Sequence, residues 1–580
     1  MSTVKSIRFS RSPLLSQRLP PWRQRLVLLL LLAGFVVLLG RALYLQGIDN
    51  EFLGDKGRAR YERVIEIAAT RGRITDRHGD ALAVATPVRS VWAIPEDARL
   101  SPARLRELAR LLGIDVRELS RKLAEERDFV YLKRQLPPVL ADQVTALKLP
   151  GIHLQAEYRR YYPAGEVTAH VLGFTGVDDV GQEGIELAFE TPLAGKPGSR
   201  RVIKDRRGNV VEDVESLHPP VEGRDVTLAL DAKIQYLAYT HLRQSIIENH
   251  AKAGSAVVLD VRSGEVLALV NLPSFNPNNR VGLSGAQLRN RALTDSFEPG
   301  STLKPFTIGL ALEEGKVRFD TPIQTAPGKF TIGSATISDA HVHGLLTVAE
   351  VIQKSSNVGA AKIALSMQPQ AMWQMFDDVG FGAPLKLGFP GEAGGRLRSV
   401  KTWRPIEQAT MSYGHGISVT LIQLARAYLA FARDGDLLPL SLTRVDTPTA
   451  SGKQVFSAQT AREVRAMLES VVGPGGTAPK AHIPGYRVAG KTGTAHKVED
   501  GGYARNKYVA SFVGFAPVSD PRLVIAVMVD EPSNGRYYGG DVAAPVFAQV
   551  MGGALRTLGV PTDAPLTPLP ADLAPVPEEM

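Results

Sequence analysis

The sequence predicts an α+β protein with an N-terminal transmembrane helix, a mixed α/β domain, and a second domain with a central antiparallel sheet flanked by helices. Three observations predict this fold class. A continuous apolar run lies near the N-terminus, strand-like runs occur both early and late in the second domain, and helical segments fill the stretch between them. Because an antiparallel sheet can be completed by both ends of one domain, this order favours α+β.

Length and composition exclude several function classes. The chain has 580 residues, enough for two folded units, with 44 % hydrophobic and 22 % charged residues. The formal net charge is +9, but part of the basic excess lies at the extreme N-terminus, which weakens a nucleic-acid-binding interpretation. The chain has no cysteine, which excludes disulfides, thiol catalysis, cysteine-ligated zinc and iron–sulfur clusters.

The apolar run at residues 26–45 predicts a membrane anchor. A spanning helix needs roughly 20 apolar residues, and Arg41 can extend its charge to the interface. Basic residues precede the run, so the positive-inside rule places residues 1–25 in the cytoplasm and the rest outside. A cleaved signal peptide is the alternative, disfavoured by the length of the run and by the lack of a small-x-small cleavage site. The preceding basic residues are Lys5, Arg8, Arg11, Arg18, Arg23 and Arg25.

Two folded regions follow the anchor. Residues 57–225 mix strand-like runs with helical stretches at Arg104–Leu112 and Leu119–Glu126, and they contain few catalytic clusters, so we expect a pedestal or interaction domain. Residues 226–560 carry the α+β pattern. The tail, residues 561–580, is rich in proline and alanine without periodicity, which is typical of disorder.

The second region begins and ends with strands. Ala256–Asp260 and Val266–Val270 flank a turn and predict a β-hairpin, and Tyr508–Phe515 and Leu523–Val529 predict a late strand pair. The segments predicted to be helical are Thr302–Glu314, Thr347–Ala364, Ile417–Arg433, Thr460–Val472 and Ala543–Leu558.

The first chemical motif is Ser301-Thr302-Leu303-Lys304, at the start of a predicted helix, where residues three apart share a face. A serine hydroxyl is a weak nucleophile until a base takes its proton. Lysine can be that base when burial or a nearby cation lowers its pKa. A helix N-terminus also favours the negative charge that develops during attack.

The second motif is Ser355-Ser356-Asn357, which we expect between two helices. The Ser355 hydroxyl can relay a proton between the base and a leaving amine, and the Asn357 side chain can hold a substrate amide. The alternative is that these side chains satisfy local backbone groups, as such residues often do.

The third motif is Lys491-Thr492-Gly493-Thr494, just before the late strand pair. On an edge strand, Lys491 and the hydroxyls of Thr492 and Thr494 can bind a substrate carboxylate. Gly493 allows close approach of an extended peptide that adds to that edge. The alternative for this motif is a simple turn.

Each motif alone is a weak signal, because the chain contains decoys. Ser2-Thr3-Val4-Lys5 repeats the first motif and Ser274-Phe275-Asn276 the second. Context rejects both, since the first decoy lies in the predicted cytoplasmic tail and the second precedes Ser301. His341 and His343 lack i,i+4 helical spacing and a carboxylate partner, so a surface loop is favoured over a metal site.

The ordered set S-x-x-K, S-x-N and K-[ST]-G is associated with penicillin-binding proteins and related β-lactamases. From about Arg71 to Leu558 the chain resembles class B penicillin-binding proteins, and among them the septal, division-specific type known as FtsI or penicillin-binding protein 3. The segments that carry this resemblance outside the three motifs are Arg71–Gly79, Tyr161–Pro163, Gly181–Glu186, Phe297–Gly300, Tyr537–Gly540 and Ala544–Phe547.

The resemblance implies a peptidoglycan D,D-transpeptidase. Ser301 would attack the penultimate carbonyl of a D-alanyl-D-alanine stem peptide with Lys304 as the base, and Ser355 would pass the proton to departing D-alanine. Asn357 would position the acyl donor, and Lys491 would hold its carboxylate with Thr492 and Thr494. An amine of a second stem peptide would complete the cross-link. β-Lactams would acylate the same serine, and no metal or organic cofactor is implied.

The resemblance also implies an inner-membrane protein with a cytoplasmic N-terminus and a periplasmic catalytic domain at the division septum. Its implied partners are peptidoglycan stem peptides, β-lactams, the septal glycosyltransferase FtsW and other division proteins, without nucleic acid. In this reading Arg71 and Glu186 are structural. Three other functions stay open: a β-lactamase-like hydrolase, a non-enzymatic penicillin-binding division scaffold, and a D,D-carboxypeptidase.

Overall fold

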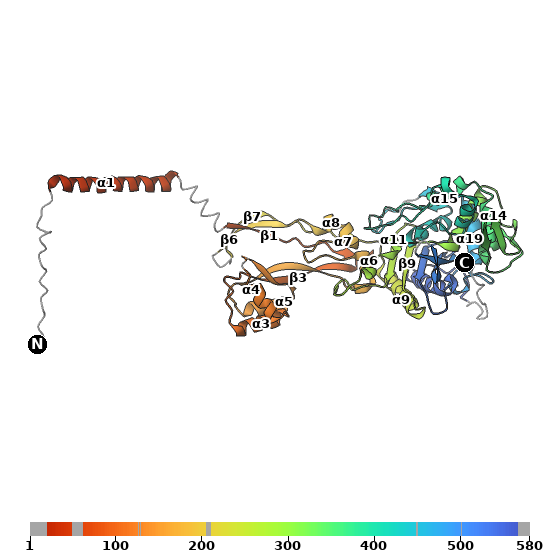
Figure 1. The fold of residues 1–580 in the computed structure, drawn as a ribbon, viewed down its shortest axis with the longest axis horizontal. Helices are drawn as coiled ribbons and strands as arrows, with labels where there is room; N and C mark the ends of the chain where they lie inside the picture. The colour runs from red at the N-terminus through yellow and green to blue at the C-terminus, as the bar shows by residue number, and fades with distance from the viewer. Residues whose placement is uncertain are drawn as a thin grey trace. The chain divides into compact units, whose positions relative to one another are not determined.

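The computed structural model describes residues 20–48, 62–125, 127, 129–204, 210–447, 451–499 and 502–566. They belong to two compact units, which we describe separately. The first comprises residues 1–68 and 197–220, and the second residues 69–196 and 221–580 (Figure 1). Most of the predicted cytoplasmic tail, the Asp205–Arg207 segment and residues 567–580 lie outside the described residues.

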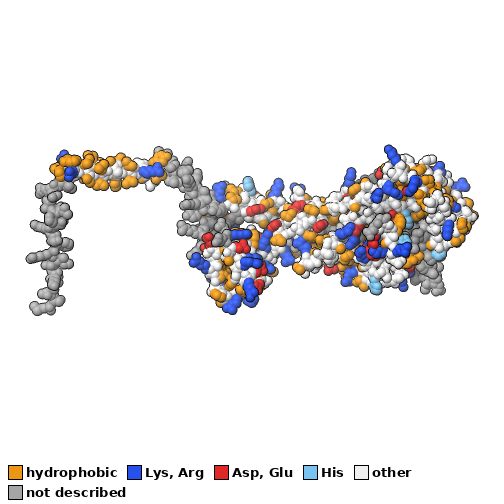
Figure 2. All heavy atoms as spheres, in the orientation of Figure 1, with side chains coloured by type: hydrophobic (Ala, Val, Ile, Leu, Met, Phe, Trp, Pro, Cys, Tyr) orange, Lys and Arg blue, Asp and Glu red, His pale blue; other side chains and the backbone are white. Residues whose placement is uncertain are grey.

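The first unit contains the predicted anchor. Helix α1 (Pro21–Leu43) continues into a π-helical turn (Tyr44–Ile48), and the span Pro21–Gln46 is long and apolar enough to cross a membrane. Figure 2 shows hydrophobic side chains along this helix and basic ones near its ends. The unit also contains an antiparallel sheet in the order β1-β6-β7. Its strands are β1 (Glu62–Ile67), β6 (Gly198–Lys204) and β7 (Val210–His218).

The N-terminal part of the second unit mixes strands and helices, as predicted. The helix predicted at Arg104–Leu112 is confirmed as α3 (Pro102–Leu112), capped by the Ser101 hydroxyl. The helix predicted to start at Leu119 starts at Val116, because the Asp115 carboxylate caps it there. The remaining elements are β2 (Ile74–Thr75), β3 (Ala81–Ala93), α4 (Val116–Leu123), β4 (Val130–Leu136), α5 (Pro138–Ala146), β5 (Ile152–Tyr161), α6 (Ala169–Leu172), α7 (Gly184–Ala188), α8 (Glu190–Ala194) and β8 (Val226–Thr227).

A five-stranded antiparallel sheet in the order β10-β9-β21-β20-β19 forms the core of the C-terminal part. The early hairpin and the late strands meet in register, with Val257 of β9 opposite Ala526 of β21. The prediction that both ends of one domain complete the sheet is therefore confirmed, and β19 lies at its edge. The strands are β9 (Ala253–Asp260), β10 (Val266–Leu272), β19 (Ala489–Glu499), β20 (Gly502–Ala516) and β21 (Leu523–Asp530).

Helices cover both faces of this sheet. On one face, the absent side chain of Gly254 leaves room for Ile246 of α9 (Ala232–Glu248), and Phe547 of α21 (Ala544–Thr557) packs on Phe512. On the other face, Asn271 accepts a hydrogen bond from the backbone of α11 (Arg291–Thr294). The other helices of eight or more residues here are α12 (Lys304–Glu313), α14 (Asn357–Ala364), α15 (Pro369–Asp378) and α19 (Ala458–Ser470).

The structure corrects the first two predicted helices of this part. The segment predicted at Thr302–Glu314 begins as a 3₁₀ turn (Gly300–Leu303) and becomes α-helical only at Lys304, where Pro305 occupies the first turn. The segment predicted at Thr347–Ala364 is two helices, α13 (Val348–Lys354) and α14. They are separated because Ser355 adopts a left-handed backbone conformation.

Two further segments differ from the prediction. Residues 417–433 begin with strand β16 (Val419–Thr420) before helices α17 (Leu421–Ala427) and α18 (Leu429–Ala432), because Thr420 caps α17. Residues 561–566 of the predicted disordered tail are bound to the domain. The Asp563 carboxylate accepts a hydrogen bond from the Arg487 backbone at 2.7 Å.

Candidate active site

Ser301 lies in the 3₁₀ turn that follows strand β11 (Ser296–Phe297). The backbone N–H of Lys304, the residue that caps this turn, donates to the Ser301 carbonyl. The Thr302 hydroxyl closes the turn by donating to the Pro299 carbonyl at 2.8 Å. Gly300 has φ +58°, and a side chain at Gly300 would meet the Thr494 carbonyl oxygen at 3.3 Å. The turn that carries Ser301 therefore packs closely against β19.

The Ser355 hydroxyl joins the first and third motifs. Lys304 donates to the Ser355 Oγ at 3.0 Å, and Lys491 donates to the same oxygen at 2.9 Å. Lys304 also donates to the Ser355 carbonyl. All three side chains are buried, with 0 % exposure. Residues far apart in the sequence are thus brought into one hydrogen-bonded cluster, as their order and context predicted.

Asp339 holds the second motif in place. Its carboxylate accepts hydrogen bonds from the Ser356 hydroxyl at 2.6 Å and from the Val358 backbone at 2.8 Å. The Asn357 amide donates to the Ser338 carbonyl at 3.4 Å. Nothing in the sequence pattern marked Asp339, because its role depends on a strand hairpin that folds back on the motif.

Strand β19 presents the third motif at the sheet edge. The Lys491 ammonium lies 3.2 Å from the Thr492 Oγ1, and the Thr477 and Thr492 hydroxyls are 2.9 Å apart. The Thr494 hydroxyl accepts a hydrogen bond from the Gly539 backbone at 3.0 Å. The Thr492 hydroxyl is therefore oriented by Thr477, which the sequence did not identify, and the Thr494 hydroxyl by Gly539, within the Tyr537–Gly540 segment.

Gly493 has a structural reason in addition to the predicted one. A side chain there would meet the Ser511 hydroxyl at 2.5 Å and the Pro299 carbonyl at 2.7 Å. Glycine is required because the Pro299–Thr302 turn packs directly on the strand. The close approach of a substrate backbone to Gly493 stays a prediction.

Sequence reasoning assigned no role to two titratable side chains near the catalytic turn. His415 packs against Tyr413 and Tyr503, and burial, with a smaller contribution from the charge of Lys304, lowers its pKa to about 4. Glu298 accepts hydrogen bonds from the Gly416 backbone at 2.9 Å and the Tyr503 hydroxyl at 3.0 Å, while burial raises its pKa. His415 is therefore neutral at pH 7. Only the position of Glu298, three residues before Ser301, could have suggested its importance.

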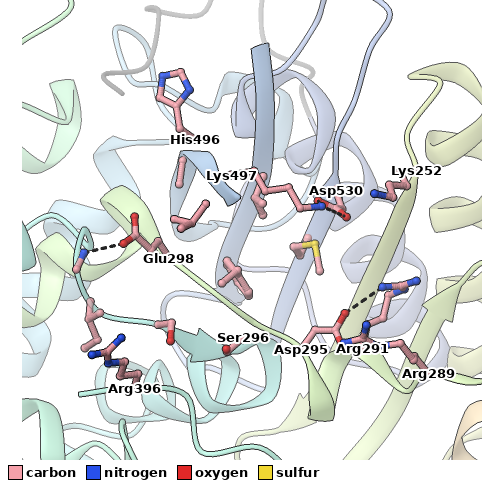
Figure 3. Close-up of a pocket in the computed structure, with 18 of the residues that line it drawn as sticks. Lys252, Arg289, Arg291, Asp295, Ser296, Glu298, Arg396, His496, Lys497 and Asp530 are labelled. Carbon is pink, nitrogen blue, oxygen red and sulfur yellow. Dashed lines mark hydrogen bonds and ion pairs between the residues drawn. The ribbon is translucent and has the colours of Figure 1, made fainter. Parts of the chain in front are cut away.

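A cavity of about 760 Å³ opens along β19 beyond Thr494. It is lined by Ala495, His496, Lys497 and Val498 on this strand and by Glu298 on the segment that leads to Ser301. Figure 3 shows charged side chains around it, with the Lys497–Asp530 ion pair near its centre. Among the described residues, no group of three or more His, Cys, Asp or Glu side chains is placed to hold a metal ion.

Comparisons with known proteins identify the family. The family described as penicillin binding protein transpeptidase domain matches residues 254–552, and penicillin-binding protein dimerisation domain matches residues 66–228. The chain belongs to the penicillin-binding proteins. It is 44 % identical over 93 % of its length to the probable peptidoglycan D,D-transpeptidase PenA of Neisseria gonorrhoeae, covering 94 % of that protein.

Two other members of the penicillin-binding proteins support the same assignment. Peptidoglycan D,D-transpeptidase FtsI of Escherichia coli K12 is 44 % identical over 94 % of this chain and 93 % of its own length. The apo transpeptidase domain of Burkholderia pseudomallei penicillin-binding protein 3 is 53 % identical, with a TM-score of 0.54, and covers 58 % of this chain and 98 % of its own. The predicted resemblance to the FtsI or penicillin-binding protein 3 type is confirmed.

Proposed function

We propose that this penicillin-binding protein is a septal peptidoglycan D,D-transpeptidase that acts through an acyl-enzyme on Ser301. The observation that carries the proposal is the meeting of Lys304 and Lys491 on the Ser355 hydroxyl, beside the turn that bears Ser301. This arrangement gives a nucleophile, a base and a proton relay within one buried site. We place the pedestal at residues 57–225 and the transpeptidase domain at residues 226–560.

In the acylation step, Lys304 takes the proton of the Ser301 hydroxyl as its oxygen attacks the penultimate carbonyl of a D-alanyl-D-alanine stem. The backbone N–H groups of Ser301 and Thr494 donate to the oxyanion, and each such donor typically contributes about 3 kcal/mol. The carbon–nitrogen bond then breaks, and Ser355 delivers the proton to departing D-alanine. An amine of a second stem attacks the ester, loses a proton to the same relay and releases Ser301.

Substrate binding is assigned to the remaining site residues. Lys491, Thr492 and Thr494 hold the terminal carboxylate of the donor. Asn357 donates to an amide of the donor, and Gly493 gives the edge of β19 its close packing against the catalytic turn. β-Lactams acylate the same serine, because their ring amide is attacked as the donor amide is.

The anchor supports a location at the inner membrane. Helix α1 can span the bilayer, and we infer from the basic residues before it that the N-terminus is cytoplasmic and the catalytic domain periplasmic. As a member of the FtsI type, the chain is proposed to act at the septum with the glycosyltransferase FtsW and other division proteins.

Covalent labelling of the full-length protein with a fluorescent penicillin tests the proposal. Ser301→Ala is expected to abolish both labelling and cross-linking, because no other group supplies the attacking oxygen. Ser274→Ala is the matched control, since the Ser274 hydroxyl only donates to the Glu166 carbonyl at 2.7 Å. Label that is lost again within seconds would indicate a β-lactamase instead. A Ser301→Ala protein that still supports septation would indicate a scaffold.

A further inference from the structure

The turn that carries Ser301 is held between two parts of the catalytic domain. On one side, strand β11 pairs with β16, and Phe297 lies opposite Val419. On the other side, Gly300 packs on Thr494 of β19. The distance between the Ser301 hydroxyl and β19 therefore depends on the contacts that the segment before Ser301 makes with both sides.

The loop at residues 413–416 is in direct backbone contact with this turn. The Gly300 N–H donates to the Gly414 carbonyl at 3.4 Å. Gly414 has φ +86°, and a side chain there would lie 2.2 Å from the Gly300 carbonyl oxygen, so only glycine allows this approach. The next residue of the loop, His415, packs against the ring of Tyr503 on β20. A shift of the loop would therefore displace the catalytic turn.

Glu298 connects the two sides through its two carboxylate oxygens. Its Oε1 accepts the Gly416 backbone N–H at 2.9 Å, and its Oε2 accepts the Tyr503 hydroxyl at 3.0 Å. Figure 3 shows the first of these bonds. Gly416 belongs to the loop that touches the turn, and Tyr503 belongs to β20, whose partner strand β19 carries the third motif. A single side chain, three residues before Ser301, thus ties the turn to both neighbours.

The surroundings of Glu298 favour a carboxylate that accepts from both donors. Burial raises the pKa of Glu298, but its two hydrogen bonds and the charge of Arg398 oppose the shift. Burial and the charge of Glu298 raise the pKa of Tyr503, so its hydroxyl stays protonated and donates. Hydrogen bonds to a charged acceptor are stronger than neutral ones. Glu298 therefore restrains the turn more than a neutral side chain of the same shape would.

We propose that Glu298 is a positioning residue of the acylation step, which sets the distance between the Ser301 hydroxyl and β19 by holding the 413–416 loop and Tyr503 on either side of the turn. The attacked carbonyl must meet the Ser301 oxygen and the Thr494 N–H together. A displacement of about 1 Å at a reacting group can cost about 10²-fold in rate. This inference rests on the proposed function and adds a residue that acts through Ser301.

Two variants weaken these contacts separately. Glu298→Gln keeps the shape and one acceptor oxygen, but its amide nitrogen cannot accept from the second donor. Tyr503→Phe removes only the hydroxyl. With the full-length protein in detergent, the time course of fluorescent-penicillin labelling at several concentrations gives the limiting acylation rate constant and the apparent dissociation constant. We expect the rate constant of Glu298→Gln to fall about tenfold, the size of effect that a charge-assisted hydrogen bond gives, with little change in the dissociation constant.

The second variant and a control separate positioning from folding. Tyr503→Phe, at an exposed position, is expected to slow acylation about threefold, because Gly416 still holds the carboxylate, and it gives the test if Glu298→Gln does not fold. The double variant should be slower by less than the product of the two single effects. Glu313→Gln is the matched control and keeps the wild-type rate constant. Its carboxylate also accepts a backbone and a hydroxyl hydrogen bond, both from Ser457 at 3.0 Å, at the other end of α12.

The outcomes distinguish this inference from the proposed function. The final amount of label counts the active molecules, so a variant that merely folds poorly shows less label at the wild-type rate constant. That result for Glu298→Gln, or a changed dissociation constant alone, overturns the positioning role and leaves the transpeptidase intact. Fully multiplicative effects in the double variant overturn the joint action of Glu298 and Tyr503. A wild-type protein that forms no acyl-enzyme with penicillin overturns the proposed function, and this role with it.

Discussion

The pedestal and the catalytic domain each bury two cations around one oxygen-bearing side chain, but with opposite chemistry. In the pedestal, the Glu186 carboxylate accepts from Arg71 at 2.7 Å and from Arg160 at 2.6 Å. In the catalytic domain, the Ser355 hydroxyl is the shared acceptor of Lys304 and Lys491. A carboxylate neutralises the charge beside it and holds arginine protonated. A hydroxyl carries no charge and cannot neutralise the lysines beside it. A lysine, unlike an arginine, can lose its proton when it is buried.

This difference separates a structural cluster from a chemical one. Arginine stays charged in the pedestal, so its ion pairs can only fix geometry. Two buried ammonium groups around a hydroxyl each disfavour the protonated form of the other, which is the condition for a lysine base. We therefore expect changes in the catalytic cluster to affect rates, and changes in the pedestal cluster to affect stability.

The largest expected effect is on the chemical step. Lys304→Met keeps the side-chain volume but removes the base, and we expect penicillin acylation to slow by about 10³-fold, within the usual contribution of general base catalysis. The rate is measured from the time course of fluorescent labelling. The control is Lys362→Met, since Lys362 donates to the Gln324 carbonyl and lies over the Phe330 ring, outside the Ser355 cluster. Labelling of Lys304→Met at the wild-type rate would show that another group is the base.

The next largest effect is on stability. Glu186→Gln leaves the buried Arg160 guanidinium without its carboxylate and leaves Arg71 with Glu190 alone, and breaking such a buried pair costs about 3–5 kcal/mol of unfolding free energy. Urea unfolding followed by tryptophan fluorescence measures it. Glu157→Gln, which disrupts a more exposed pair with Arg134, is expected to cost about 1 kcal/mol or less. Equal costs for the two variants, or slower acylation per folded molecule in Glu186→Gln, would contradict the division of roles.

Sequence alone predicted the parts of the site that short motifs encode. Ser301, Lys304, Ser355 and Lys491 could be proposed because residue type, spacing and order together exclude the decoys. All four lie within the residues that match the transpeptidase-domain family. The sheet could also be predicted, since β-branched runs bracket the helices. The roles assigned to individual side chains stay predictions.

The groups that surround the motifs could not be predicted. Asp339, Thr477 and His415 reach the site from segments without a recognisable pattern, and only tertiary packing brings them there. The motif at Ser355 was expected between two helices and lies there, but the helical segment predicted at Thr347–Ala364 did not show the break, because a left-handed conformation at a non-glycine residue carries no composition signal. Some helices begin at other residues than predicted, because a capping side chain or a proline determines where the first turn forms.

The third prediction concerns the pH dependence of stability that Asp179 gives the pedestal. Burial raises the pKa of Asp179 from 3.8 to about 6, although the charges of Arg71 and Arg160 oppose the shift. Because the folded state holds the Asp179 proton more tightly than the unfolded state does, this carboxyl adds to the free energy of unfolding. The contribution is fully present below pH 3.8 and is lost as the pH rises through about 6. Between pH 4 and 7 the free energy of unfolding of Asp179→Asn should therefore change by about 1–2 kcal/mol less than that of the wild type. Identical pH profiles would show that Asp179 is not desolvated in this way.

The smallest expected effect is in the catalytic domain. It tests whether substrate binding depends on the orientation of the Thr492 hydroxyl. Thr477→Val keeps the shape but removes the hydroxyl 2.9 Å from the Thr492 Oγ1. Losing one neutral hydrogen bond costs about 1 kcal/mol, so we expect KM for a peptide donor to rise about fivefold while kcat changes less. Thr477→Ser restores the hydroxyl and should restore KM. A purely structural role for Thr477 predicts instead that Val and Ser lower stability without separating KM from kcat, and the paired kinetics of these two variants decide between the two roles.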